Sequence, residues 1–334
     1  MKKLLSVLLV AVMLVSTLSL FSCSNKYYDE VEPVGNEDET VLSTKYGDVK
    51  YDLFRAFYLT YKNGGYSHSD SARMAIDNAL DILAVFALCE DMDIDTESRD
   101  IYNKVDDIIV ACVDGGTVDG VEYQGYGDFD KYLAAISAMY MTDRVNRLII
   151  RYSLCENMLI EKFKEVTTPT NEAVKEYFLS DDCIRITWFV SEYRESADRA
   201  HAALAGLSGD DAITNVFVQY SLATVSASSQ KNGWYLGKSE SSQELRNVSD
   251  RAFALGVGEY SEVMLGGDGN YYIVYRMEKV ASYVDTNLSD VKSSYIYNEL
   301  GKTLDTAKAD MRAGVSYSDF YSQITANDGV GIVQ

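Results

Sequence analysis

Histidine and basic residues are scarce in this sequence. Its 334 residues include two histidines, His68 and His201, which lie far apart in the chain. This disfavours a histidine-rich metal site and a nucleophile activated by histidine, and with them most hydrolase mechanisms. Lys and Arg number 30 against 51 Asp and Glu, so the net charge is −21. Because a phosphate backbone is bound by clustered cations that displace its counterions, we expect no nucleic-acid partner.

The overall composition is that of a soluble globular protein. Hydrophobic residues make up 47% of the chain and charged residues 24%, which excludes a fully disordered chain, a collagen-like fibre and a multi-span membrane protein. The length leaves room for about two domains. The segment from Asp91 to Asp95 imitates the start of a calcium-binding loop, but Thr96 stands where that loop needs glycine. We therefore expect neither a metal ion nor another cofactor.

The N-terminus has the pattern of an export signal. Two lysines precede an apolar stretch from Leu4 to Leu20. At its end, Leu20-Phe21-Ser22-Cys23 resembles the lipobox of bacterial lipoproteins, which implies removal of residues 1–22 and acylation of Cys23. The alternative is an uncleaved anchor helix, because the stretch approaches the ~17 residues that can span a bilayer. The place of the cysteine favours the lipoprotein, so we predict an extracytoplasmic protein that is lipid-anchored to a bacterial cell membrane.

Four further cysteines follow Cys23. They are Cys89, Cys112, Cys155 and Cys183. Outside the cytoplasm four cysteines can form disulfides in three pairings. The first three fall within apolar patterns of helical spacing, where cysteine usually serves as a small buried hydrophobic residue. These patterns favour free thiols.

The mature chain begins with an acidic segment and continues with helices. Residues 23–43 are predicted to be a flexible tether, because six acidic side chains repel one another there. Apolar residues at helical spacing then predict several helices within residues 44–182. A long amphipathic helix from Leu288 to Met311 should end at Gly314. Its apolar stripe needs a partner, and we expect residues 281–334 to pack on the N-terminal region.

Residues 183–280 have a different periodicity. Ile184 to Val190 is rich in β-branched and aromatic residues, which is typical of a β-strand. Two helices, a short strand and another helix are expected next, followed by strands Tyr260–Leu265 and Tyr271–Met277, which flank a glycine-rich hairpin loop. The fold class of the whole chain is therefore predicted to be α+β.

This order of elements, and four stretches of sequence, resemble the parvulin family of peptidyl-prolyl isomerases. The matching stretches are Phe217 to Ser221, Asn232 to Gly237, Ala252 to Val263 and Tyr271 to Val274. With the export signal and the flanking helices, the layout is similar to PrsA-type foldase lipoproteins and SurA-type periplasmic chaperones. The resemblance implies a helical chaperone-like domain, made of residues 44–182 and 281–334, with a parvulin-like βααβαββ module inserted at residues 183–280.

The polar catalytic positions of the family are replaced in this sequence. Trp188 and Tyr272 stand where the family has its two histidines, and the family's Cys or Asp falls near Leu222 and Ala223. Isomerisation of an Xaa-Pro bond requires no covalent step, only a lower barrier to rotation. The resemblance implies peptidyl-prolyl isomerase activity, and the replacements predict that this activity is weak or lost.

The apolar positions of the family's proline pocket are retained. Leu236, Leu245, Val248 and Phe253 lie at or near positions that line or support this pocket, although such residues also fit a simple hydrophobic core. The resemblance implies a membrane-anchored foldase or chaperone that acts on unfolded exported polypeptides. The alternative is a non-catalytic holdase or assembly lipoprotein that uses the parvulin fold as a binding surface.

Overall fold

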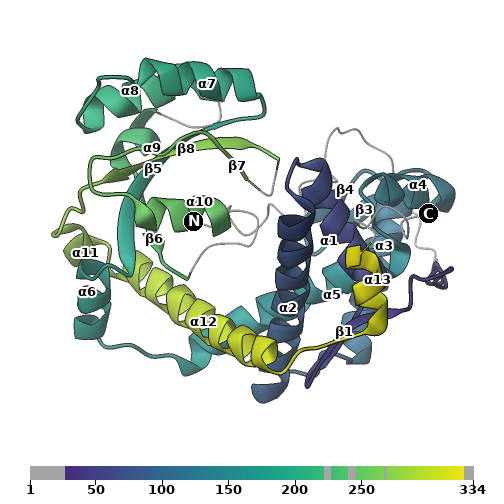
Figure 1. Cartoon of the computed structure of the whole chain (residues 1–334). Helices are drawn as coiled ribbons and strands as arrows, with labels where there is room; N and C mark the ends of the chain where they lie inside the picture. The colour runs from purple at the N-terminus through teal and green to yellow at the C-terminus, as the bar shows by residue number, and fades with distance from the viewer. Residues whose placement is uncertain (1–26, 222–226, 240–245, 267–268, 327–334) are drawn as a thin grey trace. The chain divides into compact units, whose positions relative to one another are not determined.

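The computed structural model describes residues 27–221, 227–239, 246–266 and 269–326 (Figure 1). It divides into two compact units, one formed by residues up to Lys162 together with those from Thr306, and the other by Phe163–Asp305. We call them the helical unit and the sheet unit. The helices and small antiparallel sheets confirm the predicted α+β class. Cys23, Leu222, Ala223 and Leu245 lie outside the described residues.

The helical unit combines helices with two small sheets. Its helices are α1 (Tyr51–Asn63), α2 (His68–Asp91), α3 (Arg99–Asp114), α4 (Phe129–Ala138), most of α5 (Asp143–Val166), the end of α12 (Leu288–Ala313) and α13 (Asp319–Ala326). One sheet has the order β2-β1-β9, formed by β2 (Gly47–Lys50), β1 (Thr40–Thr44) and β9 (Ser316–Tyr317). The other is a hairpin of β3 (Gly116–Val118) and β4 (Val121–Tyr123).

Local sequence signals explain where these helices begin and what they bury. The side chain of Ser67 accepts a hydrogen bond from the Asp70 amide at the start of α2, and Asp128 does the same for the Lys131 amide at the start of α4. Each cap satisfies an amide that the helix leaves unpaired. The apolar faces of α3 and α4 meet the β3–β4 hairpin in one buried cluster.

The described part of the acidic segment, from residue 27 onward, makes defined contacts with the helical unit. The Tyr28 carbonyl accepts a hydrogen bond from Arg147, and the Asp38 carboxylate pairs with Arg144. From Thr40 the chain forms β1, which pairs with β2 and β9. Of the six acidic side chains, Asp38 pairs with an arginine of α5, whereas Arg147 holds the backbone at Tyr28. Charge repulsion predicts a flexible tether, because the sequence does not show that these arginines lie beside the segment, and the bounds 23–43 stay a prediction.

The sheet unit contains a four-stranded antiparallel sheet of order β6-β5-β8-β7. Its strands are β5 (Cys183–Ser191), β6 (Trp234–Gly237), β7 (Met264–Leu265) and β8 (Tyr271–Met277). Its helices are α6 (Asn171–Leu179), α7 (Arg194–Ala203), α8 (Asp210–Tyr220), α9 (Ala227–Asn232), α10 (Arg246–Ala254), α11 (Tyr283–Thr286) and the first part of α12. The predicted strand at Tyr260–Leu265 is shorter in the structure, where Tyr260 forms an isolated bridge with Tyr275.

Helices cover both faces of this sheet (Figure 1). α7 and α8 pack on one face, where Phe189, Phe217 and Ile273 are fully buried. α10 packs on the opposite face with Ile186 and Val274. The sheet is thus the middle layer of the unit, and its two central strands, β5 and β8, bury side chains on both faces.

Helix α12 begins in the sheet unit and ends in the helical unit. In the sheet unit, Val291 packs in a cluster with Val174 and Phe178 of α6. A Cβ at Gly301 would overlap the carbonyl oxygen of Ser239, so the close approach of that backbone requires glycine. From Thr306 onward, Lys308 pairs with Asp81 of α2. The sequence predicts that residues 281–334 pack on the N-terminal region. These domain bounds stay a prediction.

Three cysteines of the helical unit are buried. Cys89, Cys112 and Cys155 are free thiols in helices, as the apolar patterns indicated, and Cys183 is buried at the start of β5. The Cys89 sulfhydryl donates to the carbonyl oxygen of Cys155 at 3.5 Å. Burial raises the pKa of Cys112 to about 11. Cys112 therefore stays a neutral thiol near neutral pH.

Candidate functional site

The candidate site is the face of the four-stranded sheet that α10 covers. Alternation along β5 places Ile184, Ile186, Trp188 and Val190 on this face, while Phe189 lies on the other. Tyr272 and Val274 of β8 join the same cluster. We call this surface the Trp188 face. The cluster consists of aliphatic and aromatic side chains, with no carboxylate, imidazole or thiol among its described members.

Trp188 is half-buried and stacks on another tryptophan. Its ring centroid lies 4.7 Å from that of Trp234, and the ring planes differ by 5°. Trp234 begins β6 and pairs with Ile186, two residues before Trp188 on the same face. The chain contains only these two tryptophans. The indole predicted at a family histidine position therefore belongs to an aromatic pair.

Tyr272 lies on the same face as Trp188 and is 6% exposed. In the β5–β8 register, Trp188 is opposite Val274, whereas Tyr272 is opposite Val190. The two aromatic residues are therefore diagonal neighbours, which in antiparallel sheets lie about 7–8 Å apart. The structure brings together the residues predicted at the two histidine positions, and both belong to an apolar cluster.

The predicted pocket residues that the structure describes are in the same cluster. Val248 of α10 is buried, and Phe253 of α10 and Leu236 of β6 are half-buried against the cluster. Leu245 lies outside the described residues. The sequence left open whether these residues line a proline pocket or form a hydrophobic core. In the structure the described ones pack in one cluster on the Trp188 face, which is compatible with both interpretations.

A buried polar link lies behind Trp188. The hydroxyl of Thr187 donates to the side-chain carbonyl of Gln230, and the Gln230 amide donates to the Trp188 carbonyl oxygen at 2.7 Å. Both Thr187 and Gln230 are fully buried. Because each polar group has a partner, this link holds the backbone of Trp188 against α9. Gln230 and Trp234 were not among the predicted site residues, although Trp234 lies in the matched stretch Asn232 to Gly237.

A separate depression of about 490 Å³ lies at the start of α7. Its lining is polar and charged: Glu192, Tyr193, Arg194, Glu195, Ser196, Arg199 and Tyr271. Tyr271 packs with the α7–α8 cluster, on the sheet face opposite Tyr272. This depression therefore does not coincide with the site that the sequence predicts.

Neither a metal-binding cluster nor a membrane-spanning helix is present in the described part of the chain. Within residues 27–326, apart from the gaps given above, no group of three His, Cys, Asp or Glu side chains could hold a metal ion. The same residues include no helix that is long and apolar enough to cross a membrane.

Comparisons with known proteins found similarity to solved structures. No family model matches the chain, and no curated protein matches it. The PrsA foldase of Streptococcus pneumoniae is 17% identical, with 87% of this chain and 100% of that chain covered and a TM-score of 0.34. PrsA of Bacillus subtilis is 19% identical, with 83% and 93% covered and a TM-score of 0.27. A SurA-like chaperone of Campylobacter jejuni is 11% identical, with 84% and 99% covered and a TM-score of 0.29.

These solved structures are of the two types that the sequence resembles, PrsA foldases and SurA-like chaperones. Their TM-scores lie well below 0.5.

Proposed function

We propose that this protein is a lipid-anchored, extracytoplasmic foldase or chaperone that binds unfolded exported polypeptides at the half-buried tryptophans of the Trp188 face, Trp188 and Trp234, with isomerase activity weak or lost. The observation that supports this proposal is the stacked pair of Trp188 and Trp234 on the face that also holds Tyr272. Aromatic and aliphatic side chains bind unfolded segments through apolar contact, which depends little on sequence.

The chemistry of the face favours binding over catalysis. Lowering the rotation barrier of an Xaa-Pro bond, about 20 kcal/mol, depends on polar groups that favour the twisted imide. Trp188 offers an indole, which only donates hydrogen bonds, and the stack on Trp234 covers one face of its ring. This observation also favours the alternative, a non-catalytic holdase or assembly lipoprotein with the same binding face.

Binding can be tested by suppression of aggregation. The full chain is added to a reduced, unfolded model protein, and light scattering is followed. We expect wild type to suppress scattering and Trp188→Ala to lose most of this effect. Tyr193→Ala is the matched control, because Tyr193 is an aromatic residue of the same unit that is 66% exposed and lines the separate depression. Equal suppression by both variants would contradict the assignment of the Trp188 face.

The anchor is tested independently. Mass spectrometry of protein extracted from membranes should show a chain that begins at Cys23 and bears a diacylglyceryl group. A membrane-bound chain that begins at Met1 would support the uncleaved anchor instead.

A further inference from the structure

The segment that leads into the helical unit is fastened to that unit over most of its length. We call residues 28–39 the strap. Its first residues lie on α4 and α5, and its last residues continue into β1. Two arginines, Arg144 and Arg147, and one aromatic stack make the main contacts, and hydrogen bonds to Asp143 and Asp114 add to them.

Arg147 holds the start of the strap. Its side chain is 8% exposed, and its guanidinium donates to the Tyr28 carbonyl at 2.7 Å, to Asp143 at 2.8 Å and to Asp106 at 2.7 Å. The buried Asp143 carboxylate also accepts from the Val31 amide at 3.2 Å. One buried ion pair thus provides a donor and an acceptor for the strap backbone, and buried pairs are screened little by salt.

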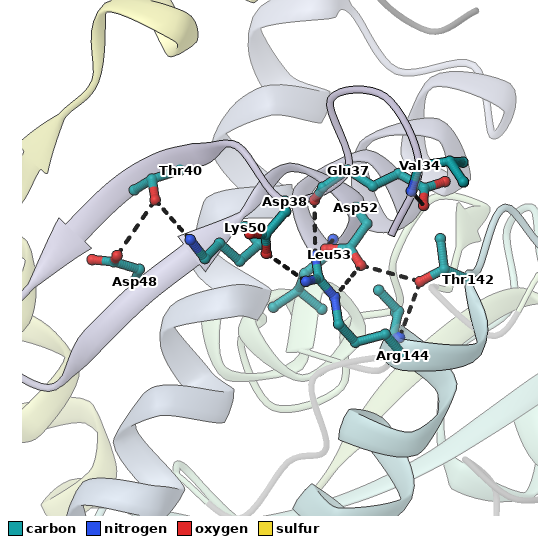
Figure 2. Close-up of polar contacts among 11 residues, drawn as sticks. Val34, Glu37, Asp38, Thr40, Asp48, Lys50, Asp52, Leu53, Thr142 and Arg144 are labelled. Atoms are coloured by element: carbon teal, nitrogen blue, oxygen red, sulfur yellow. Dashed lines mark hydrogen bonds and ion pairs between the residues drawn. The ribbon is translucent and has the colours of Figure 1, made fainter. Parts of the chain in front are cut away.

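Arg144 holds the end of the strap (Figure 2). Its Nε donates to the buried carboxylate of Asp52 at 2.8 Å, and its two terminal nitrogens donate to the Asp38 carboxylate at 2.5 Å and to the Glu37 carbonyl at 2.9 Å. The Thr142 hydroxyl donates to the same Asp52 oxygen at 3.1 Å. A single guanidinium therefore joins the strap to α1 and α5.

An aromatic stack adds apolar contact at the start of the strap. The ring of Tyr28 lies 4.8 Å from that of Phe129, with 10° between the planes. Its hydroxyl donates to Asp114 at 3.0 Å. Stacked aromatic pairs contribute beyond their buried area, so Tyr28 is the side chain that best fixes this end of the strap.

We propose that the strap holds the helical unit at the membrane surface, with the lipid bilayer as its partner. This inference rests on the proposed acylation of Cys23. Only residues 24–27 separate Cys23 from Tyr28, so their extended reach is at most about 18 Å. If the chain were free as far as Thr40, the reach would be about 60 Å. The strap therefore gives the helical unit a short connection to the membrane instead of a long one.

Docking of the strap is measured by hydrogen exchange on the full chain in detergent, with Cys23→Ser as a sample that cannot be acylated. The double variant Tyr28→Ala, Val31→Pro removes the aromatic stack and the Val31 amide but leaves both arginines with their helix partners. We expect peptides within residues 28–39 to exchange at least about tenfold faster in the double variant. Asp29→Ala, at an exposed position, is the control. Equal exchange in wild type and the double variant overturns the proposal.

The distance to the membrane is measured by energy transfer from a donor on Glu122→Cys, an exposed position of β4, to acceptors in the headgroups of vesicles. An inserted Gly-Ser segment of 20 residues after Asn25 adds about 25 Å of reach, and should lower transfer about twofold or more. The double variant Tyr28→Ala, Val31→Pro should also lower energy transfer, because release of the strap lengthens the connection to the membrane. Equal transfer with and without the insertion overturns the proposal. If the chain is never acylated but residues 28–39 remain protected from hydrogen exchange, both the anchor and the membrane partner are overturned. Only the contact between the strap and the helical unit would then stand.

Discussion

Trp188 and Trp234 stack face to face, with centroids 4.7 Å apart and planes within 5° of parallel. The pair joins β5 to the edge strand β6 on the face that also holds Tyr272. One residue of the pair stands where a parvulin is expected to have a histidine. One face of its ring is covered by another indole. An indole donates one hydrogen bond and accepts none, whereas the imidazole that the resemblance implies at this position can do both.

The stack should be visible in solution. Two parallel indoles at this separation couple their electronic transitions and give paired circular dichroism bands of opposite sign. We expect this couplet in wild type and its loss in both Trp188→Phe and Trp234→Phe. Each variant should also lower the free energy of unfolding by about 1–2 kcal/mol. Tyr193→Phe should leave the couplet intact, and a couplet that survives removal of one tryptophan would contradict the stack.

The end of α12 should stabilise the helical unit through Lys308. Lys308 and Asp81 have side chains 9% and 14% exposed, whereas Arg312 and Asp77 are 49% and 28% exposed. Lys308→Met leaves the Asp81 charge poorly solvated and should lower the free energy of unfolding by about 3 kcal/mol. Arg312→Ala is the matched control at the same end of the helix, with an expected change below about 1 kcal/mol. Denaturant unfolding measures both, and equal effects would count against this packing.

Glu156 should make the stability of the helical unit depend on pH. Burial raises the pKa of its carboxyl group, and the nearby Asp81 raises it further. The folded state therefore keeps this proton to higher pH than the unfolded state does. The protonated carboxyl group contributes its full stability below the pKa of the unfolded state, near 4.5, and this contribution is lost as the pH rises through the higher pKa of the folded state. Glu156→Gln retains an acceptor for the Tyr152 hydroxyl.

Glu156→Gln should consequently be more stable than wild type at pH 7, and the difference should vanish near pH 4. Unfolding curves across this pH range measure it. The exposed Glu122→Gln is the control and should show no such trend. A Gln variant that is less stable than wild type at pH 7 would show that the Glu156 charge is favourable in the fold.

Much of the fold could be predicted from periodicity. The spacing of apolar residues indicated the long helices, and Gly314 follows the end of α12 at Ala313. The hairpin β1–β2 was missed because its strands of five and four residues are too short to show alternation. The strap was missed because its structure depends on Arg144 and Arg147, more than a hundred residues away.

The candidate site could be predicted in part. A resemblance placed Trp188 and Tyr272, and alternation along β5 and β8 puts them on one face. The stack with Trp234 could not be predicted, because it depends on the register between β5 and β6. Whether Leu236, Val248 and Phe253 contact a client stays a prediction.

The central claim is that the Trp188 face binds unfolded chain and that its peptidyl-prolyl isomerase activity is weak or lost. NMR exchange spectroscopy on an Xaa-Pro peptide with the full chain at catalytic concentration tests it most directly. We predict an exchange rate within about twofold of the uncatalysed process, which takes tens of seconds. A strong acceleration by wild type that Trp188→Phe abolishes would contradict the account, because it would make the indole itself part of a working isomerase.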